Sequence, residues 1–449
     1  MGFAEPTIKV RRDFRSLAVV FVSALILRAL YLYAMSTQFD ADQICQLVPD
    51  SSKYIRVAQY MIGSDTTAET ELFLVGPGFP LFLVPFLKIF GVNGWPILFI
   101  QIILSSLSCS LIYLFALILL EDRTAALTAG LLSAIYLTSI SLSAVLLTET
   151  LFIFLFLLSL NLFFRGLIVG NRRDFIWSGI AGGVSILVRS VSQFFWILFM
   201  VFAIVYSRKR IHAWNGPLIW PMITAAIMLL FIAGWGFRNY AKHQVFTIAE
   251  TGLGAARVYL VPRVICDSKP GQDLFKVKDE IDKPRSIGEQ SQTIKDRHDE
   301  SIQIIRSAFI ESPSQFLITY FNIVWENVTS GSLIHPKQLP QLQSVLRYYE
   351  KFTSGGNNSS FVVILSGVGL FILIVQRKFA PAMVFLSILL YFGLLTGVTY
   401  WQGSRVFFPA QAAWPILAGV VFSRLRDWIV MTVRLTRTRL NKKPAGSGL

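Results

Sequence analysis

Ionisable side chains stand beside apolar runs at widely separated points of this chain. Three are carboxylates and three are guanidinium groups, namely Asp50, Glu71, Glu149, Arg189, Arg238 and Arg405. Charges at membrane depth are costly, so they usually serve a function and find their partners among one another. A carboxylate can accept a proton from a hydroxyl group, and arginines bind phosphate through paired hydrogen bonds. If these side chains meet at one face, they would suit a lipid that presents a phosphate from the bilayer.

Asp50 opens the stretch PDSSKYIRVAQYM, which follows the first apolar run. Polar and apolar residues alternate along 50–62, which predicts an amphipathic helix lying at the membrane interface. Asp50 would lie at or next to the N-cap of this helix, where aspartate is favoured for structural reasons alone. The position therefore fits both a catalytic base and a helix cap.

The other charged residues also have structural alternatives. Glu149 would be stabilised at the N-terminus of a helix by the helix dipole. Arg189 and Arg405 could extend to the outer headgroups. Arg238 lies at a predicted interface, where structural arginines are common, and Glu71 precedes the stretch GPGFP. The residues alone leave these alternatives open.

The composition predicts the environment. Hydrophobic residues make up 54% of the chain and charged residues only 15%, whereas a soluble domain has about a quarter charged residues. Repeated apolar runs near twenty residues predict an all-α, polytopic membrane protein with about 10–11 transmembrane helices. Much of the net charge of +15 lies near the two termini, which predicts that both are cytoplasmic. Such basic flanks favour contact with membrane lipids over nucleic acid.

The run at 175–206 decides which residues share a face. As one helix it would be about 48 Å long, against a hydrocarbon core of about 30 Å, and Arg189 would lie at its centre. We therefore expect two helices, 175–188 and 191–206, that turn at the outer surface and bring Arg189 to the same face as Glu149. In the alternative, a single long helix and a full crossing at 74–90 move Glu149 to the other face. The prolines of 79–90 favour entry without crossing.

The chain divides by composition into four parts. These are an N-terminal membrane module at 1–235 with its first outer loop at 38–78, an extracytoplasmic domain at 236–357, C-terminal transmembrane helices at 358–423 and a basic cytoplasmic tail at 424–449. The extracytoplasmic domain contains a charged helix with one apolar stripe of Ile302, Ile305, Ala308 and Phe309, so we expect it to rest on the membrane. The sequences NVT at 327 and NSS at 358 fit N-glycosylation acceptors.

Other classes of site lack their signals. His243 and His335 have no paired spacing with cysteine or carboxylate that would indicate zinc. The chain has no phosphate-binding glycine loop, serine elbow or dinucleotide fingerprint. A flippase or other transporter is the alternative from a different class, but transporters tend to show repeats and broken helices at the midplane. No repeat is evident, and the polar residues gather at one predicted face.

Several stretches resemble the GT-C superfamily of membrane glycosyltransferases. They are PDSSKYIRVAQYM, GPGFPLFLVPFLKIFG, LTETLFIFLFLLSL, SGIAGGVSILVRS, GWGFRNYAKHQVFTIAETG and QGSRVFFPAQAAWPILAG, in the order that the family shows. The branch they resemble holds dolichyl-phosphate-mannose–protein mannosyltransferases and the bacterial aminoarabinose transferase. The resemblance implies a GT-C-like bundle and an enzyme that moves a sugar, with inversion, from a polyprenyl-phosphate donor to a lipid, glycan or protein acceptor on the extracytoplasmic face.

The resemblance also implies roles for residues. Asp50 matches the first-loop aspartate that acts as general base, and Arg189 and Arg405 match positions near the donor phosphate. On the residues themselves, Arg238 is a further candidate for binding the donor phosphate, and Glu149, Tyr54 and Glu71 are candidates for supporting this site or orienting the acceptor. Many members have Asp-Glu at the base position, whereas Asp50 is followed by Ser51, so Asp42 or Asp40 remains an alternative base. Some relatives use a divalent metal, but no ligand set is evident here. A lipid-linked oligosaccharide ligase or polymerase differs only in its donor and remains an alternative.

Overall fold

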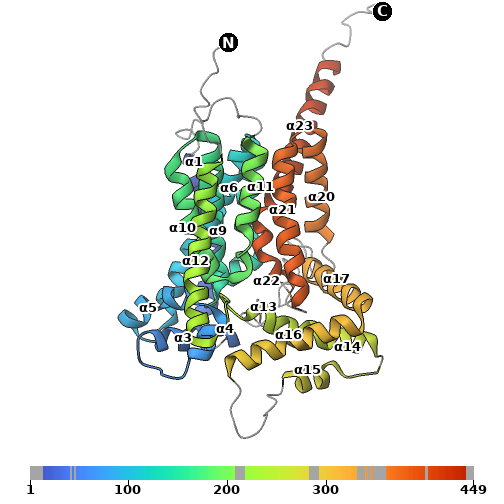
Figure 1. The fold of residues 1–449 in the computed structure, drawn as a ribbon. Coiled ribbons are helices and arrows are strands. Elements are labelled where there is room, and N and C mark those ends of the chain that lie inside the picture. Colours follow the sequence, from blue (N-terminus) through green and yellow to red (C-terminus); the bar gives the residue numbers. More distant parts are fainter. Residues whose placement is uncertain are drawn as a thin grey trace, which may run out of the picture.

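The computed structural model describes residues 14–40, 43–44, 47–207, 218–269, 271–282, 293–330, 360–399 and 403–440, with four single residues between 339 and 346. The described residues form helices joined by turns, without strands. A bundle of long helices carries a layer of shorter helices at one end (Figure 1). We call this the α3 end, after the helix α3 (Pro49–Met61) that lies there. The predicted all-α membrane fold is confirmed.

The bundle is built from helices that run between the α3 end and the opposite end (Figure 1). They are α1 (Phe14–Ser36), α6 (Gly94–Leu120), α7 (Arg123–Ile135) with α8 (Leu137–Ser143), α9 (Thr148–Val169), α10 (Arg172–Val188), α11 (Phe195–Ser207), α12 (Ile219–His243), α20 (Ser360–Val375), α21 (Phe379–Leu395) and α23 (Trp414–Leu440). The start of α1 and the end of α23 lie at the opposite end from α3.

Polar residues fix where several of these helices begin and end. The side chain of Asn93 accepts from the backbone N–H of Trp95 at the start of α6. Asp122 accepts from the N–H groups of Thr124 and Ala125 at the start of α7. Gly170 ends α9 in the left-handed conformation that glycine adopts without strain. The starts of α6, α9 and α20 lie within one residue of those expected from the apolar runs.

The span expected at 125–146 is broken. Helices α7 and α8 are bent by 53° at Tyr136, and a break frees backbone carbonyls that lipid cannot satisfy. The guanidinium group of Arg28, fully buried on α1, donates to the carbonyl of Ala134 at 3.1 Å. The amide of Gln101 on α6 donates to the carbonyl of Val145 at 2.5 Å. Neighbouring helices thus satisfy the backbone of the broken span.

The run at 175–206 forms two helices, as expected. Helix α10 ends at Val188, Arg189 is its C-cap, and the short turn η2 (Ser190–Ser192) leads into α11. Arg189 forms an ion pair with Glu149, at the start of α9. The turn between α10 and α11 therefore lies beside Glu149, and the single long helix is wrong.

By length and composition, the described residues contain five helices able to cross a membrane, or up to seven if each of two bent pairs is one span. This is fewer than the expected number because three more apolar helices are short, including α5 (Gly78–Phe90) and α11. Helix α5 has 13 residues and is therefore about 20 Å long, too short to cross alone. Helix α12 reaches His243, eight residues beyond the expected end at 235.

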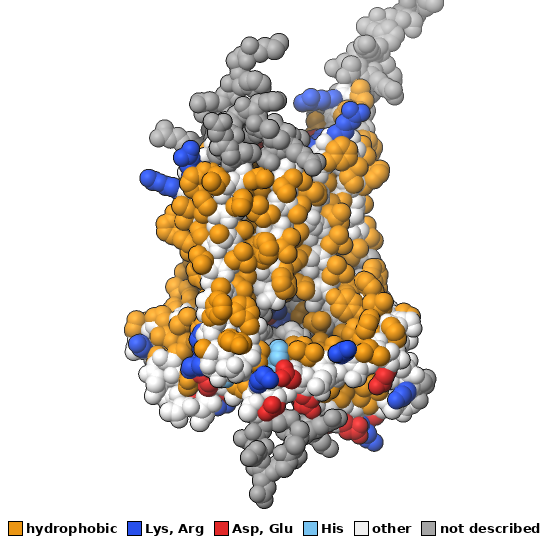
Figure 2. All heavy atoms as spheres, in the orientation of Figure 1, with side chains coloured by type: hydrophobic (Ala, Val, Ile, Leu, Met, Phe, Trp, Pro, Cys, Tyr) orange, Lys and Arg blue, Asp and Glu red, His pale blue; other side chains and the backbone are white. Residues whose placement is uncertain are grey.

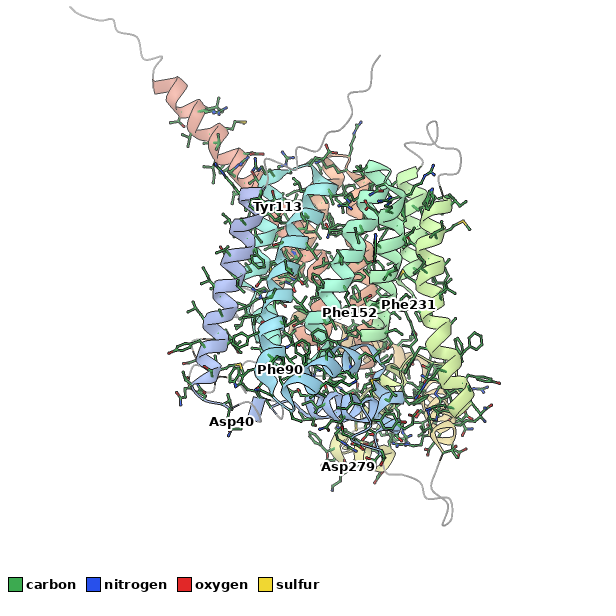
Figure 3. All side chains as sticks on the ribbon, turned by 90° about the vertical axis from the view of Figure 1, so that its left-hand side faces the viewer. Asp40, Phe90, Tyr113, Phe152, Phe231 and Asp279 are labelled. Carbon is green, nitrogen blue, oxygen red and sulfur yellow. The ribbon has the colours of Figure 1, made fainter. Side chains whose placement is uncertain are left out.

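The layer at the α3 end contains α3, α4 (Glu69–Val75), α13 (Thr251–Ala255), α14 (Val261–Ser268), α15 (Leu274–Asp282), α16 (Ile294–Glu311) and α17 (Pro313–Thr329). Thr293 and Asp296 form a capping box at the start of α16. On the predicted apolar stripe of this helix, Ala308 is buried, whereas Ile302 and Phe309 are exposed. Figure 3 shows Asp40 and Asp279 at this end and Tyr113 toward the other.

Figure 2 shows apolar side chains over most of the bundle's height, with charged side chains gathered at its two ends. This is the surface expected of a protein that spans a membrane. The same face is hollowed where the apolar belt meets the charged α3 end, with basic atoms visible in the hollow.

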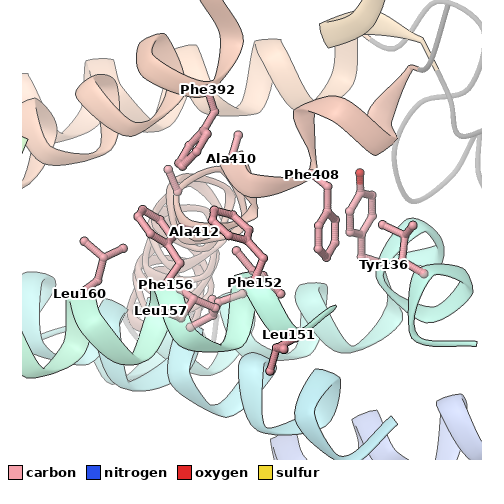
Figure 4. Packing of buried hydrophobic residues seen from close by; sticks show 14 of the residues in the cluster. Tyr136, Leu151, Phe152, Phe156, Leu157, Leu160, Phe392, Phe408, Ala410 and Ala412 are labelled. Carbon is pink, nitrogen blue, oxygen red and sulfur yellow. The ribbon is translucent and has the colours of Figure 1, made fainter. Parts of the chain in front are cut away.

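Aromatic packing fixes the start of α9 inside the bundle. Phe152 and Phe156 of α9 pack against Phe392 of α21, with ring centroids 6.3 and 5.2 Å apart. Ala410 and Ala412, in the turn η7 (Phe408–Ala412), lie beside these rings (Figure 4). All five side chains are nearly or fully buried. Since Glu149 lies one turn before Phe152, this cluster holds Glu149 toward α22 (Ser404–Phe407), the helix that precedes η7.

Candidate functional site

Arg405 joins two carboxylates that lie far apart in the sequence. Its Nη2 donates to Asp50 Oδ2 at 2.9 Å, and its Nε donates to Glu149 Oε1 at 2.8 Å. Arg189 Nη1 lies 2.8 Å from the same oxygen of Glu149. Four of the residues singled out in the sequence therefore form one cluster at the α3 end of the bundle.

Glu149 is the buried centre of this cluster. Its side chain is fully buried, and a buried carboxylate is tolerated only when cations and hydrogen bonds compensate its charge. Two guanidinium groups share Oε1, and the hydroxyl of Thr148 donates to Oε2 at 3.1 Å. Glu149 thus fixes the direction of Arg189 and Arg405.

Asp50 is the accessible carboxylate of the cluster. Its side chain is 37% exposed, while Arg405 is 16% and Arg189 22% exposed. Asp50 follows Pro49 in the first turn of α3, two residues after the N-cap, which is Val48. Lys53, one turn on, lies 3.8 Å from Asp50. Asp50 therefore has one side held by cations and another open to an incoming molecule.

Tyr54 stands one turn beyond Asp50 on α3. Its ring packs edge-on against Phe79 of α5, with centroids 5.1 Å apart. Burial raises the pKa of the Tyr54 phenol, and the negative charges of Glu149 and Asp50 raise it further. The hydroxyl therefore stays neutral and can donate a hydrogen bond beside the two carboxylates.

Close backbone contacts position the two arginines. The first residue of α5, Gly78, lies so near the backbone of Leu187 and Val188 that a Cβ would overlap it, and the next residue is Arg189. Gly403, which precedes α22, has φ of 54° and is buried, a conformation that favours glycine. Arg405 follows two residues later. Gly78 thus allows α5 to approach the backbone just before Arg189, and Gly403 allows the unusual turn before Arg405.

The other predicted residues form separate pairs. Arg238 lies 2.5 Å from Glu69 Oε1 and stacks over the ring of Trp235. Glu71 lies 2.9 Å from Arg56 Nη1. No ion pair or hydrogen bond joins Arg238 or Glu71 to Asp50 or Glu149 among the described residues. Arg238 and Glu71 thus belong to the side of this end formed by α3, α4 and α12.

Sequence reasoning missed Glu69, which is the centre of the second cluster. Glu69 accepts a hydrogen bond from Tyr60 at 2.5 Å, and it lies 3.0 Å from His243 Nε2 and 3.5 Å from Lys242. Glu69 and Glu71 are two residues apart, so a helix directs them to different sides. The signal in the sequence is that Lys242 and His243 follow Arg238 by four and five residues, which gathers positive charge near the end of α12.

The alternative base Asp40 is exposed and accepts a hydrogen bond from the backbone N–H of Gln43 at 2.8 Å. Asp42 lies outside the described residues. Across the part of the chain that the structure describes, no three His, Cys, Asp or Glu side chains form a group that could hold a metal ion. The carboxylates of the first cluster face arginines instead.

Comparison with known proteins supports the resemblance to membrane glycosyltransferases. Residues 75–236 match the family model described as dolichyl-phosphate-mannose-protein mannosyltransferase, which confirms the resemblance found in the sequence. The matched region contains Glu149 and Arg189, whereas Asp50 and Arg405 lie outside it. The comparison with curated protein sequences gives no match.

The fold is similar to that of an oligosaccharyltransferase, AglB, from the archaeon Archaeoglobus fulgidus. The structure of AglB with an inhibitory peptide and a dolichol-phosphate has a TM-score of 0.52 and 14% identity, over 99% of this chain and 53% of that one. An apo structure of the oligosaccharyltransferase from the same archaeon gives 0.51 and 14%, over 99% and 54%. This chain spans about half the length of these proteins. Together, the family match and the fold support a membrane glycosyltransferase with a GT-C-like fold.

Proposed function

We propose that this protein is an inverting glycosyltransferase that takes a sugar from a polyprenyl-phosphate donor, with Asp50 as the general base. The observation that carries the proposal is Arg405, which bridges the partly exposed Asp50 and the buried Glu149. A second arginine, Arg189, stands beside it. Two cations next to an accessible carboxylate suit a reaction in which a hydroxyl loses a proton and a phosphate leaves.

The cluster supplies a protein group for each step of the reaction. The oxygen of the acceptor hydroxyl bonds to the anomeric carbon of the sugar, and Asp50 accepts the proton that this hydroxyl loses. The bond between that carbon and the donor phosphate oxygen breaks on the opposite face, so the configuration inverts. The polyprenyl phosphate leaves with its charge stabilised by Arg189 and Arg405. Glu149 holds these guanidinium groups in place, and Tyr54 can orient the acceptor through its neutral hydroxyl.

The donor lipid would reach the site from the membrane. The hollow in Figure 2 lies where the apolar belt meets the charged α3 end, the end that holds the cluster, so a phosphate that entered there would leave its chain in lipid. Arg123, Arg172 and Lys378 lie at helix starts of the opposite end, which supports a cytoplasmic location for that end. The cluster would then act on the extracytoplasmic face, as the sequence predicts.

The decisive experiment is transfer of a labelled sugar from polyprenyl-phosphate donors by purified protein and its Asp50→Asn variant. General bases contribute about 10²–10⁴-fold to the rate, so we expect kcat to fall by at least about 100-fold while the donor still binds. Asp40→Asn is the control, because Asp40 is exposed and, among the described residues, its side chain accepts the Gln43 N–H alone. We expect a change below about threefold. Full activity of Asp50→Asn would contradict the proposal.

A second arm of this experiment tests the ligase or polymerase alternative, which the similarity in fold to an oligosaccharyltransferase favours. Oligosaccharide-bearing lipids replace the single-sugar donors, and mass spectrometry identifies the product. Transfer of a preassembled oligosaccharide alone would change the donor but not the role of Asp50. Movement of the donor between leaflets, unaffected by Asp50→Asn, would instead indicate a flippase.

A further inference from the structure

Asn327 lies where α17 meets the segment that joins α21 to α22. It is fully buried, and its amide nitrogen donates to the carbonyls of Thr396, at 3.1 Å, and of Thr399. Its Oδ1 accepts the backbone N–H of Gly403 at 3.1 Å. One side chain therefore binds the backbone on both sides of residues 400–402.

A second contact holds α17 against the same segment. The hydroxyl of Tyr320 donates to the carbonyl of Leu394, and its ring fills the space that a Cβ at Gly397 would need. Tyr320 and Asn327 are seven residues apart and thus lie on one face of the helix. The turn η6 (Thr396–Val398) is consequently fixed to α17 at two points.

The held segment leads directly to the arginine of the site. Gly403 is two residues before Arg405, and its N–H is bound by Asn327 in a buried, left-handed turn. Helix α22 has only four residues, so its position depends on the segment that precedes it. A displacement of about 1 Å in a binding group is enough to lower catalysis strongly.

We propose that Asn327 is a positioning residue that sets where Arg405 stands, and so links α17 to the phosphate-binding end of the site. This inference rests on the proposed function in that Arg405 binds the donor phosphate. It also assigns a role to the NVT sequence at 327. The amide nitrogen that glycosylation would modify is buried and donates to two backbone carbonyls. Asn327 therefore holds the neighbouring backbone instead of carrying a glycan.

The first test does not depend on activity. Hydrogen–deuterium exchange is measured on the full-length protein in detergent for Asn327→Ala and Thr329→Ala. Both variants remove the NVT sequence, but in the described part of the chain the Thr329 hydroxyl donates to the carbonyl of Trp325 within α17 alone. We expect exchange of the amides of 403–407 to rise at least about tenfold in Asn327→Ala and to stay unchanged in Thr329→Ala. Equal exchange in the two variants would overturn the proposal.

The second test asks whether Asn327 acts through Arg405. Asn327→Ala is made alone and together with Arg405→Lys, and kcat/KM for the donor lipid is measured with the folded fraction known from size-exclusion chromatography. We expect a loss of about tenfold or more in the wild-type background and below about threefold in Arg405→Lys, because coupled residues are not additive. Equal losses in both backgrounds would indicate general destabilisation and contradict the proposal. If no variant transfers sugar but exchange changes as expected, the proposed function fails and the positioning role stands.

Discussion

Arg405 Nη2 and Asp50 Oδ2 lie 2.9 Å apart although 355 positions separate the two residues in the chain. The contact brings the first loop and the last spanning segment together at one end of the bundle. It joins the partly exposed carboxylate of Asp50 to a guanidinium group that also pairs with the buried carboxylate of Glu149. Substitutions of Arg405, of its buried partner Glu149 and of residues outside the cluster should therefore differ in their effects on activity and stability.

Arg405→Lys tests the geometry of the bridge. A guanidinium group can contact Asp50 and Glu149 at once through Nε and Nη2, whereas a lysine presents a single point charge. We expect kcat/KM for the donor to fall by about 100-fold, the scale seen on removing one donor that stabilises a developing charge. The matched control is Arg263→Lys on α14, whose pairs with Asp267 and Glu326 are partly exposed. A comparable loss in the control would show that the effect is not specific to the bridge.

Glu149→Gln tests the anchor. The change leaves two arginines near a neutral amide in a buried position, and removal of one partner of a buried ion pair costs about 3–5 kcal/mol. We expect a clear fall in the midpoint of thermal unfolding in detergent. Glu71→Gln is the control because the pair that Glu71 forms with Arg56 is partly exposed, and ion pairs open to solvent are worth about 0–1 kcal/mol. Equal stability of the two variants would contradict the role of Glu149 as anchor.

The sequence predicted that the residues of the first cluster share one face, because topology determines the face. The apolar runs, the basic flanks and the excessive length of 175–206 put Asp50, Glu149, Arg189 and Arg405 at one face. Contacts that depend on helix rotation could not be predicted in this way. Glu69 and not Glu71 faces Arg238, since residues two apart point in different directions.

The role of Asn327 was also hidden from the sequence. The NVT sequence suggests an exposed acceptor, but the side chain of Asn327 on α17 points inward and hydrogen-bonds the backbone of Gly403 and Thr396. The second acceptor sequence, at Asn358, lies outside the described residues. Burial of a polar side chain depends on which helices pack together, and a short motif carries no information about that.

The second cluster predicts a pH dependence. Burial acts to raise the pKa of Glu69, but hydrogen bonds with Tyr60 and His243 and the charge of Arg238 outweigh it and hold the pKa below the ordinary value of 4.5. A carboxyl whose pKa is lowered by folding stabilises the fold above its ordinary pKa, and this contribution is lost as pH falls through the folded value. Lys242 adds a further positive charge nearby.

We therefore expect the thermal midpoint of the wild-type protein to exceed that of Glu69→Gln at pH 7. The difference should shrink as the pH falls below about 4.5. Thermal unfolding in detergent between pH 7 and 3.5 measures this, with Glu71→Gln measured alongside as a neighbouring carboxylate on the same helix. A difference between wild type and Glu69→Gln that grows on acidification would have the opposite sign and would refute this account of the cluster.

Gly78→Ala tests how α5 positions Arg189. A methyl group at Gly78 would overlap the backbone of Leu187 and Val188, and backbone cannot rotate away as a side chain can. Either α5 or the end of α10 must shift, at a cost of about 1–3 kcal/mol, and Arg189 would move from Glu149. Gly234→Ala is the matched control, because a Cβ there meets nothing within 4 Å and alanine favours the helix. We expect weaker donor binding and a lower thermal midpoint in Gly78→Ala alone. A variant that lost stability but bound the donor normally would show that α5 supports the fold without positioning Arg189.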